Sequence, residues 1–86
     1  MDLEQCLAAV RASSGARESR LVAPTAEETT ALLDFTRAVA HASERKDAPL
    51  AAYAIGIAMA DLNPAERAEI LSRAADAIDR IAVAAE

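Results

Sequence analysis

The 86-residue sequence has few of the aromatic residues that favour β-sheets: one Tyr, one Phe and no Trp. It also has only two Gly, a residue that disfavours helices. Alanine, in contrast, occupies 24 positions and is the strongest helix former. Because sheets depend on aromatic and β-branched side chains, this composition argues against one. The chain also falls below the common domain size of about 100 to 150 residues, which limits it to one domain over residues 1–86. We predict an all-α fold, a compact bundle of four short helices.

Cysteine is almost absent as well. The single Cys6 cannot form a disulfide within the chain, whereas secreted domains of this size usually need several. Residues 1–4 are acidic and do not resemble the basic start of a signal peptide. The longest uncharged stretch, residues 48–60, would span about 20 Å as a helix, short of the roughly 30 Å membrane core. We therefore expect a cytoplasmic protein with no membrane partner.

Basic residues are outnumbered: nine Lys and Arg stand against 14 Asp and Glu, for a net charge of -5. A protein of this charge repels a phosphate backbone, so we expect no nucleic-acid partner. One histidine, one distant cysteine and scattered carboxylates lack the spacing of metal ligands. No Ser or Cys stands beside a base that a third group could orient. We expect no metal and no cofactor, and the residue pattern favours a non-catalytic protein over an enzyme.

Four segments of the chain carry helix-start signals, and the expected helices cover residues 2–13, 25–44, 49–61 and 64–83. Three of these starts have a capping box, in which two residues three apart bond each other's backbone amides. The pairs are Asp2 with Gln5, Thr25 with Glu28 and Asn63 with Glu66.

The third expected helix carries no charge between Leu50 and Ala60, and helices that are apolar all round are normally buried. We expect Tyr53 in the core, with its hydroxyl reaching the polar end of the second helix. Gly56 belongs to a ridge of small residues and costs about 1 kcal/mol of helix propensity, which a closely packed neighbour would offset. A core this light is marginal, so we expect a homo-oligomer formed through the third helix or the alanine-rich face of the fourth.

His41 is the only histidine, and it lies near the end of the second helix with Glu44 and Arg45 within about one turn. One interpretation is a recognition cluster for an anion or a partner's carboxylate, oriented by Glu44. The other is a solvated helix end whose cations complement the helix dipole. Residue types alone favour the second interpretation.

The string VAHASERKDAPLAAYAIGIA, residues 39–58, resembles a family of small helical domains from actinobacteria. The shared pattern is Val-Ala-His, an Arg four residues after the His, Ala-Pro-Leu, an aromatic residue three further on and a Gly three beyond. Members are often fused to, or encoded with, a molybdenum-cofactor guanylyltransferase, which makes molybdopterin guanine dinucleotide. The resemblance therefore implies an accessory or regulatory domain and moves the His41 cluster toward a structural or recognition role.

These arguments converge on one candidate site at the junction of the second and third helices. Its residues are His41, Glu44, Arg45, Pro49, Tyr53 and Gly56. We expect a non-catalytic helical interaction module that self-associates. The alternative is an accessory component of molybdopterin guanine dinucleotide synthesis, with a nucleotidyltransferase as its protein partner.

Overall fold

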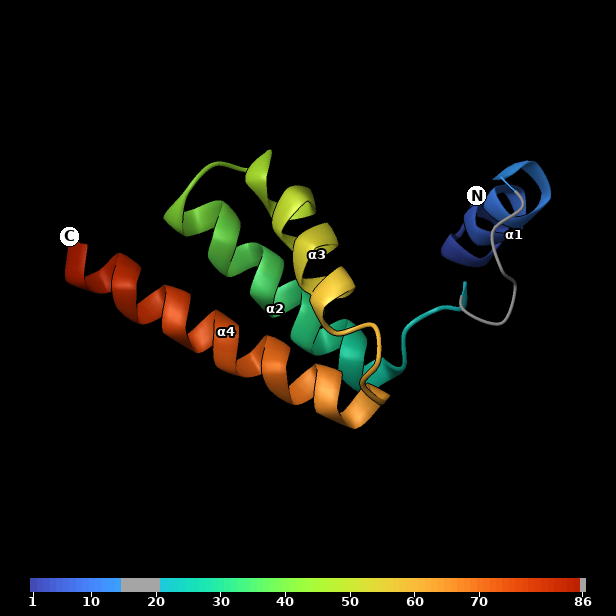
Figure 1. Ribbon diagram of the computed structural model, residues 1–86. Coiled ribbons are helices and arrows are strands. Elements are labelled where there is room, and N and C mark those ends of the chain that lie inside the picture. The colour runs from blue at the N-terminus through green and yellow to red at the C-terminus, as the bar shows by residue number, and fades with distance from the viewer. Residues whose placement is uncertain (15–20, 86) are drawn as a thin grey trace.

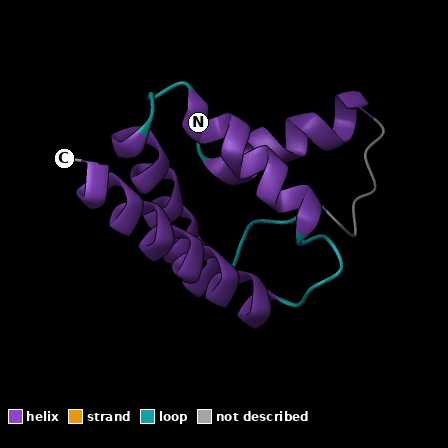
Figure 2. Ribbon diagram, turned by 60° about the vertical axis from the view of Figure 1, so that its left-hand side comes forward, coloured by secondary structure: helices purple, strands orange, loops and turns teal. Residues whose placement is uncertain are grey.

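The computed structural model describes residues 1–14 and 21–85. Within these residues it contains four helices, and Figure 1 shows their arrangement. They are α1 (Leu3–Ser14), α2 (Ala26–Ala42), α3 (Asp47–Ala58) and α4 (Pro64–Ala85). Figure 2 shows only helix and loop over the described part of the chain. The all-α prediction is confirmed, and each helix begins and ends within about three residues of its expected bounds.

Helix α2 is the centre of the packing. It packs extensively along α4 and more lightly against α3, and no other pair of the described helices is in contact (Figure 1). None of the helices in the described segments is long and apolar enough to cross a membrane. Eight buried apolar side chains form the core, and half of them are alanine: Ala31, Phe35, Ala38, Val39, Met59, Ala68, Leu71 and Ala75. Because alanine is small, the α2 and α4 backbones can approach closely.

The prediction of a buried third helix is wrong. Helix α3 has no buried residue, and its Ala51 and Ile55 are only half-buried against the core. Leu50, Tyr53 and Ile57 are 67, 73 and 61% exposed, so Tyr53 is not the core residue that we expected. The reason is that the apolar side chains of a helix become buried only where another element packs against them. Among the described helices, α3 packs against α2 alone.

Helix α1 has no contact with the other three helices within the described residues. Its predicted capping box forms, with Gln5 N–H donating to Asp2 Oδ1 at 2.9 Å and Asp2 N–H to Gln5 Oε1 at 2.8 Å. Arg11 ties the helix to the chain ahead of α2, because its Nε and Nη2 donate to the Leu21 carbonyl at 3.1 and 2.7 Å.

The other two predicted capping boxes also form, and one of them takes part in the tertiary structure. Thr25 and Glu28 bond each other's backbone amides at 3.0 and 3.1 Å and start α2. Glu28 accepts the amide with Oε1, while its Oε2 accepts a 2.7 Å bond from Arg67 Nε on α4. Arg67 Nη1 also donates to the Leu62 carbonyl, at the corner between α3 and α4. Glu28 is only 9% exposed and Arg67 is half-buried, so this ion pair joins the beginnings of two helices at a site partly shielded from solvent.

Removing one partner of this pair should destabilise the fold. We expect Glu28→Gln and Arg67→Gln each to lower the free energy of unfolding by about 2 kcal/mol, because each leaves a charged or polar group without its partner. The double variant should lose less than the sum of the two. Urea denaturation of all four proteins measures this coupling.

The exposed α4 pair Glu69 and Arg73 is the control. Their side chains are 60 and 76% exposed, so the same substitutions should couple by less than about 0.5 kcal/mol. Equal coupling energies at the two pairs would contradict the expectation that burial makes the Glu28–Arg67 pair the more stabilising one.

Stability should also depend on pH through Glu28. The hydrogen bond from Arg67 holds the pKa of Glu28 below its ordinary value, although burial acts in the opposite direction. A lowered pKa contributes stability above the unfolded pKa, and this contribution is lost as pH falls through the folded pKa. The stability difference between wild type and Glu28→Gln should therefore be constant near neutrality and shrink as the pH falls below about 4.3. Urea titrations at a series of pH values test this, and a difference that grows toward acid would contradict it.

Candidate functional site

The polar candidates lie on the surface, at the junction between α2 and α3. His41 is on the last turn of α2, and Glu44 and Arg45 are in the connection that follows; all three are exposed. Glu44 forms a 3.3 Å ion pair with Lys46. The turn itself is held by Asp47 N–H donating to the Glu44 carbonyl at 2.9 Å, so the backbone fixes how these side chains are presented.

The remaining candidates follow along α3. Pro49 lies in the first turn of the helix, where the missing amide costs no helical hydrogen bond. Pro49, Tyr53 and Gly56 are exposed. His41, Glu44 and Arg45 lie at the N-terminal end of α3, and Pro49 and Tyr53 follow on its exposed surface. Gly56 lies toward the other end of α3, where it borders an open pocket with Glu28 from the first turn of α2. The six predicted residues therefore do not form one cluster.

Sequence reasoning missed the largest feature of this surface, an apolar row on the side of α3 that faces away from the core. Lys46, Leu50, Tyr53 and Ile57 are spaced four, three and four residues apart, which places them on one side of the helix. We refer to these four residues as the outer stripe. The stripe was missed because α3 is apolar on all sides, and its sequence has no periodicity that indicates which side α2 covers.

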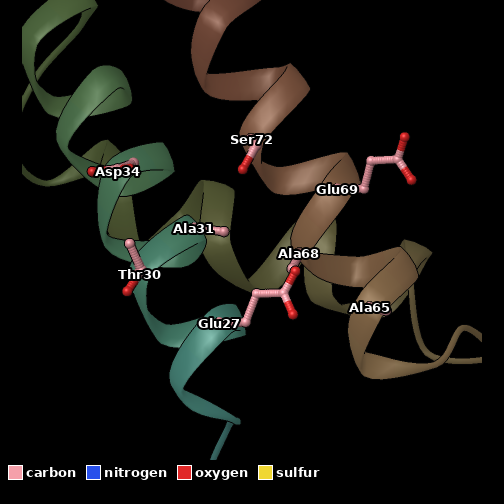
Figure 3. A pocket seen from close by; sticks show the side chains of 8 residues that line it. All are labelled: Glu27, Thr30, Ala31, Asp34, Ala65, Ala68, Glu69 and Ser72. Carbon is pink, nitrogen blue, oxygen red and sulfur yellow. The ribbon is translucent and has the colours of Figure 1, made fainter.

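A second surface feature is an open groove of about 700 Å³ between α2 and α4 (Figure 3). Its floor includes the buried Ala31 and Ala68. In Figure 3 the Glu27 carboxylate reaches toward α4, while the Glu69 carboxylate turns away from α2. Asp34, also in the lining, pairs with Arg37.

This groove offers little chemistry. Glu69 is neutralised by Arg73, as Asp34 is by its own arginine. Across the residues that the structure describes, no group of three His, Cys, Asp or Glu side chains is placed to hold a metal. The outer stripe and the adjoining junction are the better candidate site.

No part of the described chain packs closely against Gly56. Gly56 borders an open pocket of about 540 Å³, together with Ala60 and the Glu28–Arg67 pair. A Cβ atom built on Gly56 would meet nothing within 4 Å. A side chain at position 56 would therefore not collide with any other part of the described chain.

This geometry makes Gly56→Ala a stabilising substitution. Alanine would restrict the unfolded chain and favour helix without a clash, so the free energy of unfolding should rise by about 0.5 to 1 kcal/mol. Thermal or urea denaturation measures it, with Ala54→Gly as the reverse control on the exposed side of the same helix. Destabilisation by Gly56→Ala would contradict this account of α3.

Comparison with known proteins adds a family and no activity. Neither the curated proteins nor the solved structures contain a match to this chain. A family model described as a domain of unknown function (DUF6457) matches residues 2–86, nearly the whole sequence. The chain belongs to the DUF6457 family.

Proposed function

We propose that this domain is a non-catalytic helical interaction module that binds a partner protein through the outer stripe of α3. The observation that carries the proposal is the exposure of Leu50, Tyr53 and Ile57, three large apolar side chains in one row. Single exposed apolar residues are ordinary on protein surfaces, whereas contiguous apolar patches mark interaction sites.

The energetics of burial support this role. Fully burying one large apolar side chain contributes about 1.5 to 3 kcal/mol. These three are 61 to 73% exposed, so they obtain only the smaller part of that contribution within their own chain. Helix α3 meets only α2, and only lightly, so a partner on its outer side would add to its stability as well. An apolar helix face that lies in a partner's groove is a common mode of recognition.

The polar candidates fit the edge of such an interface. His41 and Arg45 are exposed just beyond the N-terminal end of the stripe. Interfaces commonly have an apolar centre and a polar rim, and tyrosine and arginine are over-represented among their energetically important residues. We assign Tyr53 to the centre of the proposed interface, and His41 with Arg45 to its rim.

A nucleotidyltransferase is the second candidate partner for this surface. The resemblance of residues 39–58 to domains associated with a molybdenum-cofactor guanylyltransferase suggests it. What favours it further is position, because Pro49, Tyr53 and Gly56 from that pattern are all exposed and so available to a partner. In this version the domain regulates molybdopterin guanine dinucleotide synthesis, and its addition should change the rate of the purified guanylyltransferase.

Site-specific photo-crosslinking in the native cytosol tests the docking surface. A benzophenone side chain placed at position 53 should form covalent protein adducts on irradiation, because that position faces the partner. The matched control is position 72 on α4, which is also exposed but is separated from α3 by α2. Mass spectrometry of the adducts identifies the partner.

Adducts from position 53 and not from position 72 are the expected result. Adducts with a guanylyltransferase would favour the second candidate partner, and adducts with the chain itself would identify a homo-oligomer. Equal adducts at both positions, or none at position 53, would contradict docking through the outer stripe.

A further inference from the structure

We propose that the partner of the outer stripe is a second copy of this chain, which docks its own outer stripe antiparallel to the first. This inference rests on the proposed function, because it names the occupant of the same surface. It is carried by the symmetry of the stripe and by the charges at its ends.

The apolar part of the stripe is symmetric about one point on α3. Leu50 and Ile57 are equally far from the midpoint between residues 53 and 54. In an antiparallel pair centred there, each Leu50 meets the Ile57 of the other copy, and the two Tyr53 side chains lie beside the axis. The spacing of four, three and four residues is the spacing with which two helices interlock their side chains.

The charges have the same centre of symmetry. Lys46 begins the stripe, and Asp61 follows α3 at the same distance from that midpoint. Asp61 lies in a tight turn directly after α3, held by backbone bonds from Ala60 N–H to Ile57 O at 3.3 Å and from Leu62 N–H to Met59 O at 3.0 Å. Antiparallel docking therefore sets each Lys46 against the other copy's Asp61, giving two ion pairs of opposite charge.

Other charges near Lys46 do not cancel this complementarity. Its 3.3 Å pair with Glu44 is between side chains that are 79 and 66% exposed, and such a pair contributes little. The neighbouring Asp47 accepts a 2.5 Å hydrogen bond from the Ser43 hydroxyl. Lys46 and Glu44 are therefore available to adjust when a second copy docks.

Small residues beside the stripe allow two copies of α3 to come close. Ala54 and Ala58 flank it on one side, and Gly56 and Ala60 flank it on the other; all four are exposed. The open space at Gly56 would then be filled from outside the chain. A two-fold axis through the stripe closes the assembly at two copies, since each copy uses its one stripe.

The competing occupant within the chain is α1, whose Leu3 and Val10 are also exposed. That helix fits the ends of the stripe less well. Its one cation, Arg11, is engaged with the Leu21 carbonyl and with Glu4 at 3.3 Å, so it is not available to Asp61. A second copy of α3 meets both ends of the stripe.

Sedimentation of the purified full chain over a range of concentrations tests the inference. The wild type should reach twice the 9.0 kDa mass of one chain at high concentration. Tyr53→Glu should stay a monomer, because it brings two carboxylates together at the axis, and circular dichroism should show that its helices are intact. Asp76→Lys on α4 is the control at an exposed acidic site, and it should dimerise like the wild type.

Charge reversal tests the antiparallel arrangement. Lys46→Glu and Asp61→Lys should each weaken self-association about tenfold, since two surface pairs become repulsive. Mixing these two variants should restore dimers, because the introduced glutamate of one copy then faces the introduced lysine of the other, and the remaining Lys46 faces the remaining Asp61. Docking of α1 within one chain would not respond to mixing.

A monomeric wild type, a Tyr53→Glu variant that still dimerises, or two reversed variants that do not pair on mixing would each overturn the inference. Failure of the proposed function looks different, because it requires that position 53 form no protein adducts in the cytosol, or no more than position 72 forms. A monomer that still forms adducts there with another protein would retain the docking surface and exclude the second copy.

Discussion

The ion pair between Glu28 and Arg67 is the contact on which the bundle's geometry depends. One carboxylate oxygen caps the start of α2 and the other receives α4, while the same guanidinium holds the Leu62 carbonyl at the corner from α3. Three chain segments thus meet at two side chains. If α4 packed on α2 in another position, Arg67 would no longer reach Glu28. The buried carboxylate would then lack its partner, which costs free energy. The alanine-rich surfaces of these helices supply little shape of their own to fix their relative position.

The placement of alanine and of the larger side chains explains why α2 packs extensively against α4 and only lightly against α3. Between α2 and α4, small side chains allow close contact along both helices, and Phe35 and Leu71 fill the space that remains. Helix α3 places its larger side chains differently. Met59 enters the core from just beyond its end, while Leu50, Tyr53 and Ile57 remain outside. The fold therefore has a firm two-helix centre and a third helix that packs Ala51 and Ile55 against the core and leaves its other large side chains exposed.

The sequence predicts those parts of the structure that local chemistry decides. All three capping boxes form, because each joins residues three positions apart. The Glu28–Arg67 pair escapes such reasoning, since its partners are separated by 39 residues. The burial of α3 was predicted wrongly for a related reason. Its uniformly apolar surface does not indicate how many other helices pack against it, and in the structure only α2 does. Tyr53 was misplaced with it, since it was expected in the core and is 73% exposed.

That error connects folding with the proposed interaction. A chain with three capping boxes and an ion-paired corner starts its helices without help from α3's outer side, so the stripe is free to be shaped by binding. If a second copy covers it, the apolar surface that this small domain leaves unused becomes part of a shared core, and stability rises with protein concentration. The lack of periodicity in α3 then has a physical meaning: one side of the helix packs on its own chain, and the opposite side is apolar because it packs on another.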